Sequence, residues 1–306
     1  MEKKVEFKSK GEILRGVLNV PDGEGPFPLL LMAGGWCYVK EIVMPTYAEE
    51  MAAVGIASLR FDYRGLGESD GAQRQQLDPW QQIEDYRNAI SYVATLPEVD
   101  TSRIGVWGIS YSGGHVLILA ATDPRVKCAI SNIPVIDGYE CMRLVHGYGK
   151  GRFAALCKLI ADDRDRRFRG EQGGLIPHNS SDPDREICTW PFTTSYEFFS
   201  RAAKTFAPNY LGRSTIESTE MLMSYSVADY LKRILNVPTQ VQIVEGDEHT
   251  PWDMQIRGFH QIASARKELS VIPKATHIGL YSRKDLQVLA ARRNAAFARK
   301  YLGEPT

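Results

Sequence analysis

The sequence lacks any apolar stretch that is long enough to cross a membrane. Its most apolar early segment, residues 27–35, is far shorter than the roughly 20 residues that a bilayer-spanning helix requires. Residues 1–8, MEKKVEFK, alternate charged and apolar positions and have no apolar core of the kind found in a signal peptide. The sequence therefore predicts a cytoplasmic protein without a membrane partner.

Paired cysteines and an excess of charge of one sign are also missing. The five cysteines are an odd number without C-x-x-C spacing, which argues against a disulfide framework and against a zinc site. The 37 basic residues (Lys and Arg) balance the 37 acidic ones (Asp and Glu). Because a nucleic-acid-binding protein normally carries a basic excess, nucleic acid is not an expected partner. Whether two copies form a homodimer is left open.

Short apolar runs that alternate with helical patterns are what the chain does contain. Hydrophobic residues make up 43% of the 306 residues, enough to bury a large core. The expected strands are 5–8, 13–20, 27–33, 56–63, 103–108, 126–131, 239–244 and 269–273, and the expected helices are 80–96, 113–122, 254–265 and 284–301. This alternation predicts an α/β fold, with a mostly parallel eight-stranded sheet flanked by helices.

The alternation stops between residues 138 and 237. This stretch has no obvious buried strand, and a structureless loop of that length is unusual in a compact domain. We therefore expect residues 138–237 to form a helical cap, inserted into a core made of residues 1–137 and 238–306. Arginines 164, 166, 167 and 169 either bind an anionic substrate tail or form a solvated helix face, and the aspartates interleaved with them favour the second reading.

The segment 103–115, RIGVWGISYSGGH, predicts a nucleophile at Ser110. A strand ends at Gly108, and small residues after Ser110 lead into a helix, as in the G-x-S-x-G elbow, with Ser112 in place of the last glycine. The alternative is an ordinary turn whose serine only caps the helix. Ser112 is the weaker candidate because it belongs to the first helical turn.

Two backbone N–H groups are expected to bind the oxyanion that such a nucleophile generates. One belongs to Tyr111, directly after the nucleophile. The other is assigned to Trp36, in the segment AGGWCYVK (33–40) that follows the strand 27–33. A plain strand-end turn is the alternative reading of the two glycines in this segment.

His277 and Asp247 are the expected base and acid. His277 follows the last predicted strand in IPKATHIG, and Asp247 follows the preceding strand in VEGDEHTP. A serine nucleophile needs a histidine base that is oriented by a carboxylate. His249 is the rival base, and Glu245 and Glu248 are rival acids. A metal site in this acidic loop is discounted because one loop offers too few converging ligands.

These segments together resemble the α/β-hydrolase superfamily. The chain order Ser–Asp–His, the elbow GISYSGG and the segment FDYRGLGES (61–69) all fit that family. Within it, AGGWCYVKE (33–41) resembles the A-H-G-F-G-G-V-K-E of the dienelactone-hydrolase-like and YcjY-like branch. Where that pattern has two glycines, this chain has Cys37 and Tyr38. Their larger side chains are expected to narrow the site and contact the substrate.

The resemblance implies hydrolysis of an ester, thioester or related acyl bond in a small molecule, without a cofactor or metal. The alternatives are a hydrolase acting on a carbon–carbon bond of a β-diketone, on an amide or on a lactone, and a ligand receptor that retains the triad without turnover. Four aromatic residues of the expected cap form either an acyl pocket or the cap's own core: Phe192, Tyr196, Phe198 and Phe199.

Overall fold

An eight-stranded sheet forms the centre of the protein. The computed structural model describes residues 1–147 and 151–303. The strands are β1 (Glu2–Ser9), β2 (Glu12–Asn19), β3 (Phe27–Ala33), β4 (Ala57–Phe61), β5 (Val99–Ile109), β6 (Cys128–Asn132), β9 (Thr239–Gly246) and β10 (Lys267–Thr276). They are arranged in the order β1-β2-β4-β3-β5-β6-β9-β10. The sheet is parallel from β4 to β10, while β1 and β2 are antiparallel. The predicted eight-stranded, mostly parallel sheet is confirmed.

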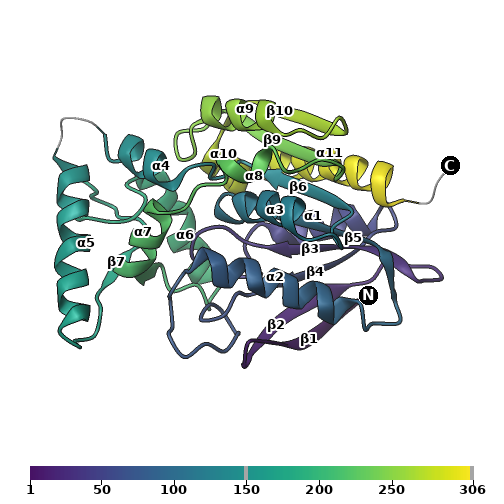
Figure 1. Ribbon diagram of the computed structural model, residues 1–306, viewed down its shortest axis with the longest axis horizontal. Coiled ribbons are helices and arrows are strands. Elements are labelled where there is room, and N and C mark those ends of the chain that lie inside the picture. Colours follow the sequence, from purple (N-terminus) through teal and green to yellow (C-terminus); the bar gives the residue numbers. More distant parts are fainter. Residues whose placement is uncertain (148–150, 304–306) are drawn as a thin grey trace.

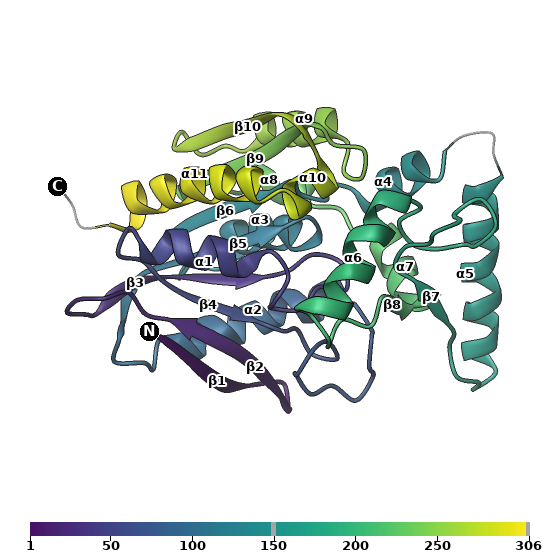
Figure 2. The same ribbon diagram turned by 180° about the vertical axis from the view of Figure 1, so that it is seen from behind.

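Helices cover both faces of this sheet. Figure 1 shows α2 (Pro79–Val93) and α3 (Tyr111–Thr122) in front of the strands. Figure 2 shows α1 (Met44–Ala52) and α11 (Lys284–Leu302) on the opposite face. Strands β3, β4 and β6 are almost entirely buried because they lie between these two layers. The remaining core helices are α9 (Trp252–Gln261) and α10 (His277–Ser282). Within the described residues, no helix is long and apolar enough to cross a membrane.

The chain between β6 and β9 forms the segment that the sequence predicted as an insertion. It contains α4 (Gly138–Val145), α5 (Arg152–Phe168), α6 (Thr193–Thr205), α7 (Ile216–Met223) and α8 (Ala228–Leu231). It also contains a pair of antiparallel strands, β7 (Leu175–Pro177) and β8 (Arg213–Thr215), that was not predicted because three-residue strands carry no periodicity. Helix α5 stands at the end farthest from the sheet (Figures 1 and 2).

Most of the arginines in and directly after α5 form ion pairs. Arg167 pairs with Asp163 (2.9 Å), Glu217 (2.8 Å) and Glu220 (2.6 Å). Arg164 also pairs with Glu220, and Arg169 pairs with Glu171. The contacts with Glu217 and Glu220 join α5 to α7, and the pairing of these arginines agrees with a solvated helix face.

His115 is a buried core residue on α3, behind the elbow. Its Nδ1 lies 2.9 Å from the Tyr225 hydroxyl and its Nε2 lies 2.9 Å from Gln82 Oε1. Burial lowers the pKa of this imidazole to about 3, so the ring stays neutral in the folded protein at pH 5–7. This placement agrees with the sequence-based reading of His115 as a packed helix residue.

We expect His115 to destabilise the fold as the pH falls from 7 to 5. In the unfolded chain the ring takes up a proton near pH 6.5, whereas in the folded protein it stays neutral down to about pH 3. The unfolded state therefore binds more protons, and the free energy of unfolding falls with pH, by about 2 kcal/mol at pH 5 from this residue. Denaturant titrations at both pH values should show a smaller loss for His115→Gln. An equal loss in both proteins would contradict the prediction.

Candidate active site

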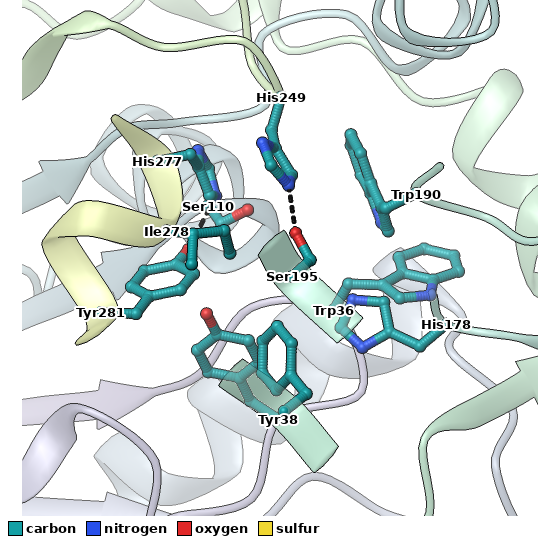
Figure 3. A pocket seen from close by; sticks show the side chains of 11 residues that line it. Trp36, Tyr38, Ser110, His178, Trp190, Ser195, His249, His277, Ile278 and Tyr281 are labelled. Atoms are coloured by element: carbon teal, nitrogen blue, oxygen red, sulfur yellow. Dashed lines mark hydrogen bonds between the residues drawn. The ribbon is translucent and has the colours of Figure 1, made fainter. Parts of the chain in front are cut away.

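A pocket with a cavity volume of about 10 Å³ lies where several parallel strands end. Its lining comes from the loops after β3, β5, β9 and β10 and from the inserted segment (Figure 3): Trp36, Tyr38, Ser110, His178, Trp190, Ser195, Phe199, His249, His277, Ile278 and Tyr281. In open α/β sheets, the carboxyl ends of the strands are the usual place for a ligand. This volume is room for about one water molecule and is far below the about 300–1,000 Å³ of ordinary ligand pockets. A substrate therefore requires the lining side chains to move apart.

Ser110 occupies a strained turn between β5 and α3. Its φ of 57° and ψ of −114° lie outside the regions that a side-chain-bearing residue normally adopts. The turn is tight enough that a Cβ added at Gly108 would lie 2.1 Å from the Ser112 carbonyl oxygen. Hydrogen bonds from Ser110 N to the Asn132 carbonyl (2.8 Å) and from Val135 N to the Ser110 carbonyl (3.0 Å) hold the strained residue in place. This strained strand-to-helix turn has the geometry expected of a nucleophile elbow.

Ser112 has a different environment. Its hydroxyl donates to the Ala33 carbonyl (2.7 Å) and accepts from Ile109 N (2.8 Å), and its side chain is fully buried. It does not line the pocket. Through these hydrogen bonds, Ser112 holds the turn after β5 against the end of β3.

Asp247 and His277 lie side by side, as the sequence predicted. His277 Nδ1 is 3.0 Å from Asp247 Oδ1 and 3.1 Å from Oδ2. The carboxylate also accepts from the backbone N–H groups of His249 (3.0 Å) and Thr250 (2.9 Å) and from the Thr250 hydroxyl (2.9 Å). All of these contacts use the carboxylate as an acceptor. As an acceptor beside Nδ1, Asp247 holds the His277 proton on that nitrogen and leaves Nε2 as the acceptor of the ring.

The Tyr281 hydroxyl lies 2.7 Å from that acceptor nitrogen. Burial raises the pKa of Tyr281 above its ordinary value, so the phenol keeps its proton and donates it to Nε2. Among the described residues, the partner of His277 Nε2 is therefore the Tyr281 hydroxyl and not the Ser110 hydroxyl. Sequence reasoning missed Tyr281, although a residue four positions after His277 on a helix was a signal that it lies on the same face.

Gly35 brings the loop after β3 against the nucleophile. A Cβ at this position would lie 3.0 Å from Ser110 Cβ and 3.5 Å from Ser110 Oγ, so a residue with a side chain would have to push the loop and the elbow slightly apart. Trp36 follows it directly, and its ring lies 5.1 Å from that of Tyr111. Tyr111 is the first residue of α3, where the backbone N–H has no partner within the helix. Both expected oxyanion-hole residues thus flank Ser110.

The two residues expected to contact substrate differ in placement. The Tyr38 hydroxyl points into the pocket (Figure 3) and is buried without a hydrogen-bond partner. The Cys37 thiol instead contacts the Arg213 carbonyl (3.4 Å) and is not among the lining side chains. Burial raises the pKa of this thiol, so it is not a thiolate nucleophile.

His249, the rival base, binds a residue of the inserted segment. Its Nε2 lies 2.6 Å from the hydroxyl of Ser195 on α6 (Figure 3). Its ring stacks on that of Phe192, with centroids 3.8 Å apart, and on that of His277, with centroids 4.6 Å apart. Sequence reasoning could not find the Ser195–His249 contact, because 54 residues separate the two.

The remaining aromatic residues of the expected cap were predicted to form either an acyl pocket or the cap's own core. Phe199 lines the pocket, whereas Phe198 is buried beside Tyr281 (centroids 6.1 Å apart) and Tyr196 is 40% exposed. Only part of this group therefore faces the site.

Asp247, His249 and His277 also form a cluster of three possible metal ligands, with donor atoms within 4.8 Å of one another. Their hydrogen bonds account for this closeness: His277 Nδ1 is directed to Asp247, and His249 Nε2 is directed to Ser195. A metal ion in this place would have to displace these bonds, so the donor set fits a hydrogen-bonded acid–base pair better than a metal centre.

Comparisons with known proteins agree with this fold. The family model for X-Pro dipeptidyl-peptidase (S15 family) matches residues 10–156. An uncharacterised 31.7 kDa protein from the traX-finO intergenic region of Escherichia coli is 41% identical over 293 residues, covering 89% of this chain and 91% of that protein. Thiohydrolase aneE of Aspergillus aculeatus is 44% identical over 134 residues, covering 44% of this chain and 42% of its own length.

A solved structure places the likeness within a fold family. The α/β hydrolase GrgF from Penicillium sp. sh18 matches with a TM-score of 0.81 and 25% identity, over 99% of both chains. None of these matches confirms the dienelactone-hydrolase-like and YcjY-like branch, so that finer placement stays a prediction. The sheet order, the elbow at Ser110 and these matches together show that the chain is a hydrolase of the α/β-hydrolase superfamily.

Proposed function

We propose that this protein is a serine hydrolase that cleaves a carboxylic ester or thioester of a small molecule through an acyl-enzyme. One observation carries the proposal. The strained Ser110 lines the same pocket as His277, and His277 is bound to a buried carboxylate on a neighbouring loop. This arrangement can activate a hydroxyl group as a nucleophile.

In the first half of the proposed reaction, Ser110 Oγ attacks the acyl carbonyl. His277 Nε2 takes the hydroxyl proton after the Tyr281 hydroxyl has moved from this nitrogen. Such hydrogen bonds are often incomplete without substrate and form in the bound complex. Asp247 balances the charge of the imidazolium, and the backbone N–H groups of Trp36 and Tyr111 stabilise the oxyanion. The imidazolium then gives its proton to the leaving alcohol or thiol.

The lining of the pocket and one relative support the choice of substrate class. The side chains around Ser110 are mostly aromatic and suit the apolar part of a small acyl substrate, and the Tyr38 hydroxyl faces the same space. The relative named thiohydrolase shares 44% identity over its matched segment and makes a thioester a natural candidate. The ester and the thioester need the same nucleophile and base, since they differ in the leaving group.

Acylation of Ser110 tests the proposal directly. Incubation with p-nitrophenyl acetate and with short acyl thioesters should give turnover, and mass spectrometry of the trapped protein should place the acyl group on the peptide containing Ser110. Turnover by a protein that never carries an acyl group on Ser110 would point to a different mechanism. Ligand-dependent movement of the segment 138–237 without any turnover would favour a receptor.

Chelators are expected to leave the rate unchanged. Each proposed step is a proton transfer or a nucleophilic attack by this chain's own residues, so no metal ion is required. The rate of p-nitrophenyl acetate hydrolysis should be the same before and after dialysis against EDTA. A loss of rate that added metal restores would show that the Asp247–His249–His277 cluster holds an ion.

A further inference from the structure

Ser195 and His249 form a second serine–histidine pair in the pocket, beside the proposed catalytic groups. The Ser195 hydroxyl lies 2.6 Å from His249 Nε2, and both side chains are almost completely buried. Ser195 comes from α6, whereas His249 belongs to the loop that also carries Asp247. Figure 3 shows the Ser195 hydroxyl and Ser110 on the same side of the pocket, facing the same space.

The surroundings of His249 decide which atom carries the shared proton. Its Nδ1 lies 3.4 Å from Glu248 Oε1 and has no hydrogen-bond partner. A carboxylate beside Nδ1 favours the tautomer with the proton on that nitrogen. Nε2 is then an acceptor, so the Ser195 hydroxyl donates to it. The lone pairs of the Ser195 oxygen remain available, and this oxygen accepts a hydrogen bond from a group in the pocket.

The pair lies next to the proposed base. The rings of His249 and His277 are nearly parallel, at 14°, with centroids 4.6 Å apart. The Nε2 atoms of both rings are directed toward the pocket, one to Ser195 and the other to Tyr281 (Figure 3). The Ser195 oxygen and His277 Nε2 therefore face the same pocket, which has room for about one water molecule.

We propose that Ser195, held by His249, positions the water that hydrolyses the acyl-enzyme and favours water over an alcohol as acyl acceptor. This inference rests on the proposed function. A water molecule has two hydrogens, one for His277 Nε2 and one for Ser195 Oγ. An alcohol has one hydroxyl hydrogen, and its alkyl group would face Ser195. Only water satisfies both acceptors, so the pair directs the reaction to hydrolysis.

The step balances without a cofactor or any change of oxidation state. The water oxygen forms a bond to the acyl carbon while one of its protons passes to His277 Nε2. The bond between the acyl carbon and Ser110 Oγ then breaks, and His277 returns the proton to Ser110. The products are a carboxylic acid and the free serine. Ser195 exchanges no proton, so it is a positioning residue rather than a catalytic one.

The test measures how the acetyl-enzyme divides between two acceptors. Protein acetylated by p-nitrophenyl acetate is allowed to react in water with added methanol, and the ratio of methyl acetate to acetate is determined. In Ser195→Ala this ratio should rise by about 3- to 10-fold, the effect of losing one hydrogen bond to water. The rate of hydrolysis of the acetyl-enzyme should fall by a similar factor, whereas the rate of acetylation should change little.

Two further variants test whether the Ser195–His249 hydrogen bond positions water or only holds the inserted segment in place. His249→Phe keeps an aromatic ring between Phe192 and His277 but removes the acceptor for the Ser195 proton, so the ratio should rise as well. Thr194→Ala changes an exposed neighbour on α6 and should leave the ratio unchanged.

Two negative outcomes have different meanings. In the first, acetylation and hydrolysis slow together in Ser195→Ala while the ratio of methyl acetate to acetate stays the same. In that case the pair only attaches α6 to the core, and the inference is wrong. If the wild-type protein never carries an acyl group on Ser110, the proposed function is wrong, and the inference about Ser195 and His249 is wrong with it.

Discussion

Replacing Ser110 with alanine is expected to lower kcat by a factor on the order of 10⁶, as removal of the nucleophile does in serine proteases. The variant should fold, because the backbone hydrogen bonds to Asn132 and Val135 that hold the turn at residue 110 remain. Steady-state turnover of p-nitrophenyl acetate measures the loss, and a circular dichroism spectrum checks the fold.

Ser112→Ala is the matched control for this prediction. It should retain turnover, since Ser112 does not line the pocket, but it leaves Ile109 N and the Ala33 carbonyl without their buried partner. Buried groups left unpaired cost about 1–3 kcal/mol, which should appear as a lower melting temperature. If Ser112→Ala abolished turnover and Ser110→Ala did not, the nucleophile would be Ser112.

Asp247→Asn is expected to lower kcat by a factor on the order of 10⁴. Asp247 Oδ1 accepts from two backbone N–H groups, so an asparagine would keep its oxygen there and place its NH₂ group at the Oδ2 position. That position lies 3.1 Å from His277 Nδ1. The NH₂ group at this position would donate to His277 Nδ1, so Nδ1 would be an acceptor and the ring proton would lie on Nε2. His277 would then lack the lone pair on Nε2 that it needs to act as the base. Single-turnover acylation should show the loss.

Glu245→Gln provides the control for the acid. Glu245 is exposed at the end of β9, and its Oε2 accepts from Lys274 N at 3.1 Å, away from the pocket. Its substitution should change kcat by less than about twofold, as expected for a surface residue. A large loss in Glu245→Gln with little loss in Asp247→Asn would reverse the assignment of the acid.

The fold was predictable because the core follows simple patterns. Strands such as β3 and β6 are continuous apolar runs, as expected for strands buried on both faces. Helix α10 was missed because six residues give too short a pattern, although it carries His277. The sequence predicted a helical insertion between β6 and β9, and the described part of that segment has five helices and two short strands. Their arrangement depends on distant contacts, such as those between α5 and α7.

The sequence by itself determined the elbow and the order of the proposed catalytic groups. Gly108, Ser110 and Gly113 act through local backbone geometry, and Asp247 and His277 each follow a strand directly, so parallel pairing of the strands brings them to one edge of the sheet. These are consequences of neighbouring residues and of a regular sheet.

Only the tertiary structure decided what surrounds the proposed base. Tyr281 reaches His277 Nε2 because α10 turns over the pocket, and Ser195 reaches His249 because α6 packs against the loop after β9. Cys37, expected from the sequence to face the substrate, instead turns to Arg213 on β8. These contacts join residues that are far apart in the chain or depend on the direction of a helix. Local spacing could place Tyr281 on the same helix face as His277, but it could not show which atoms meet, because the packing of whole elements fixes those contacts.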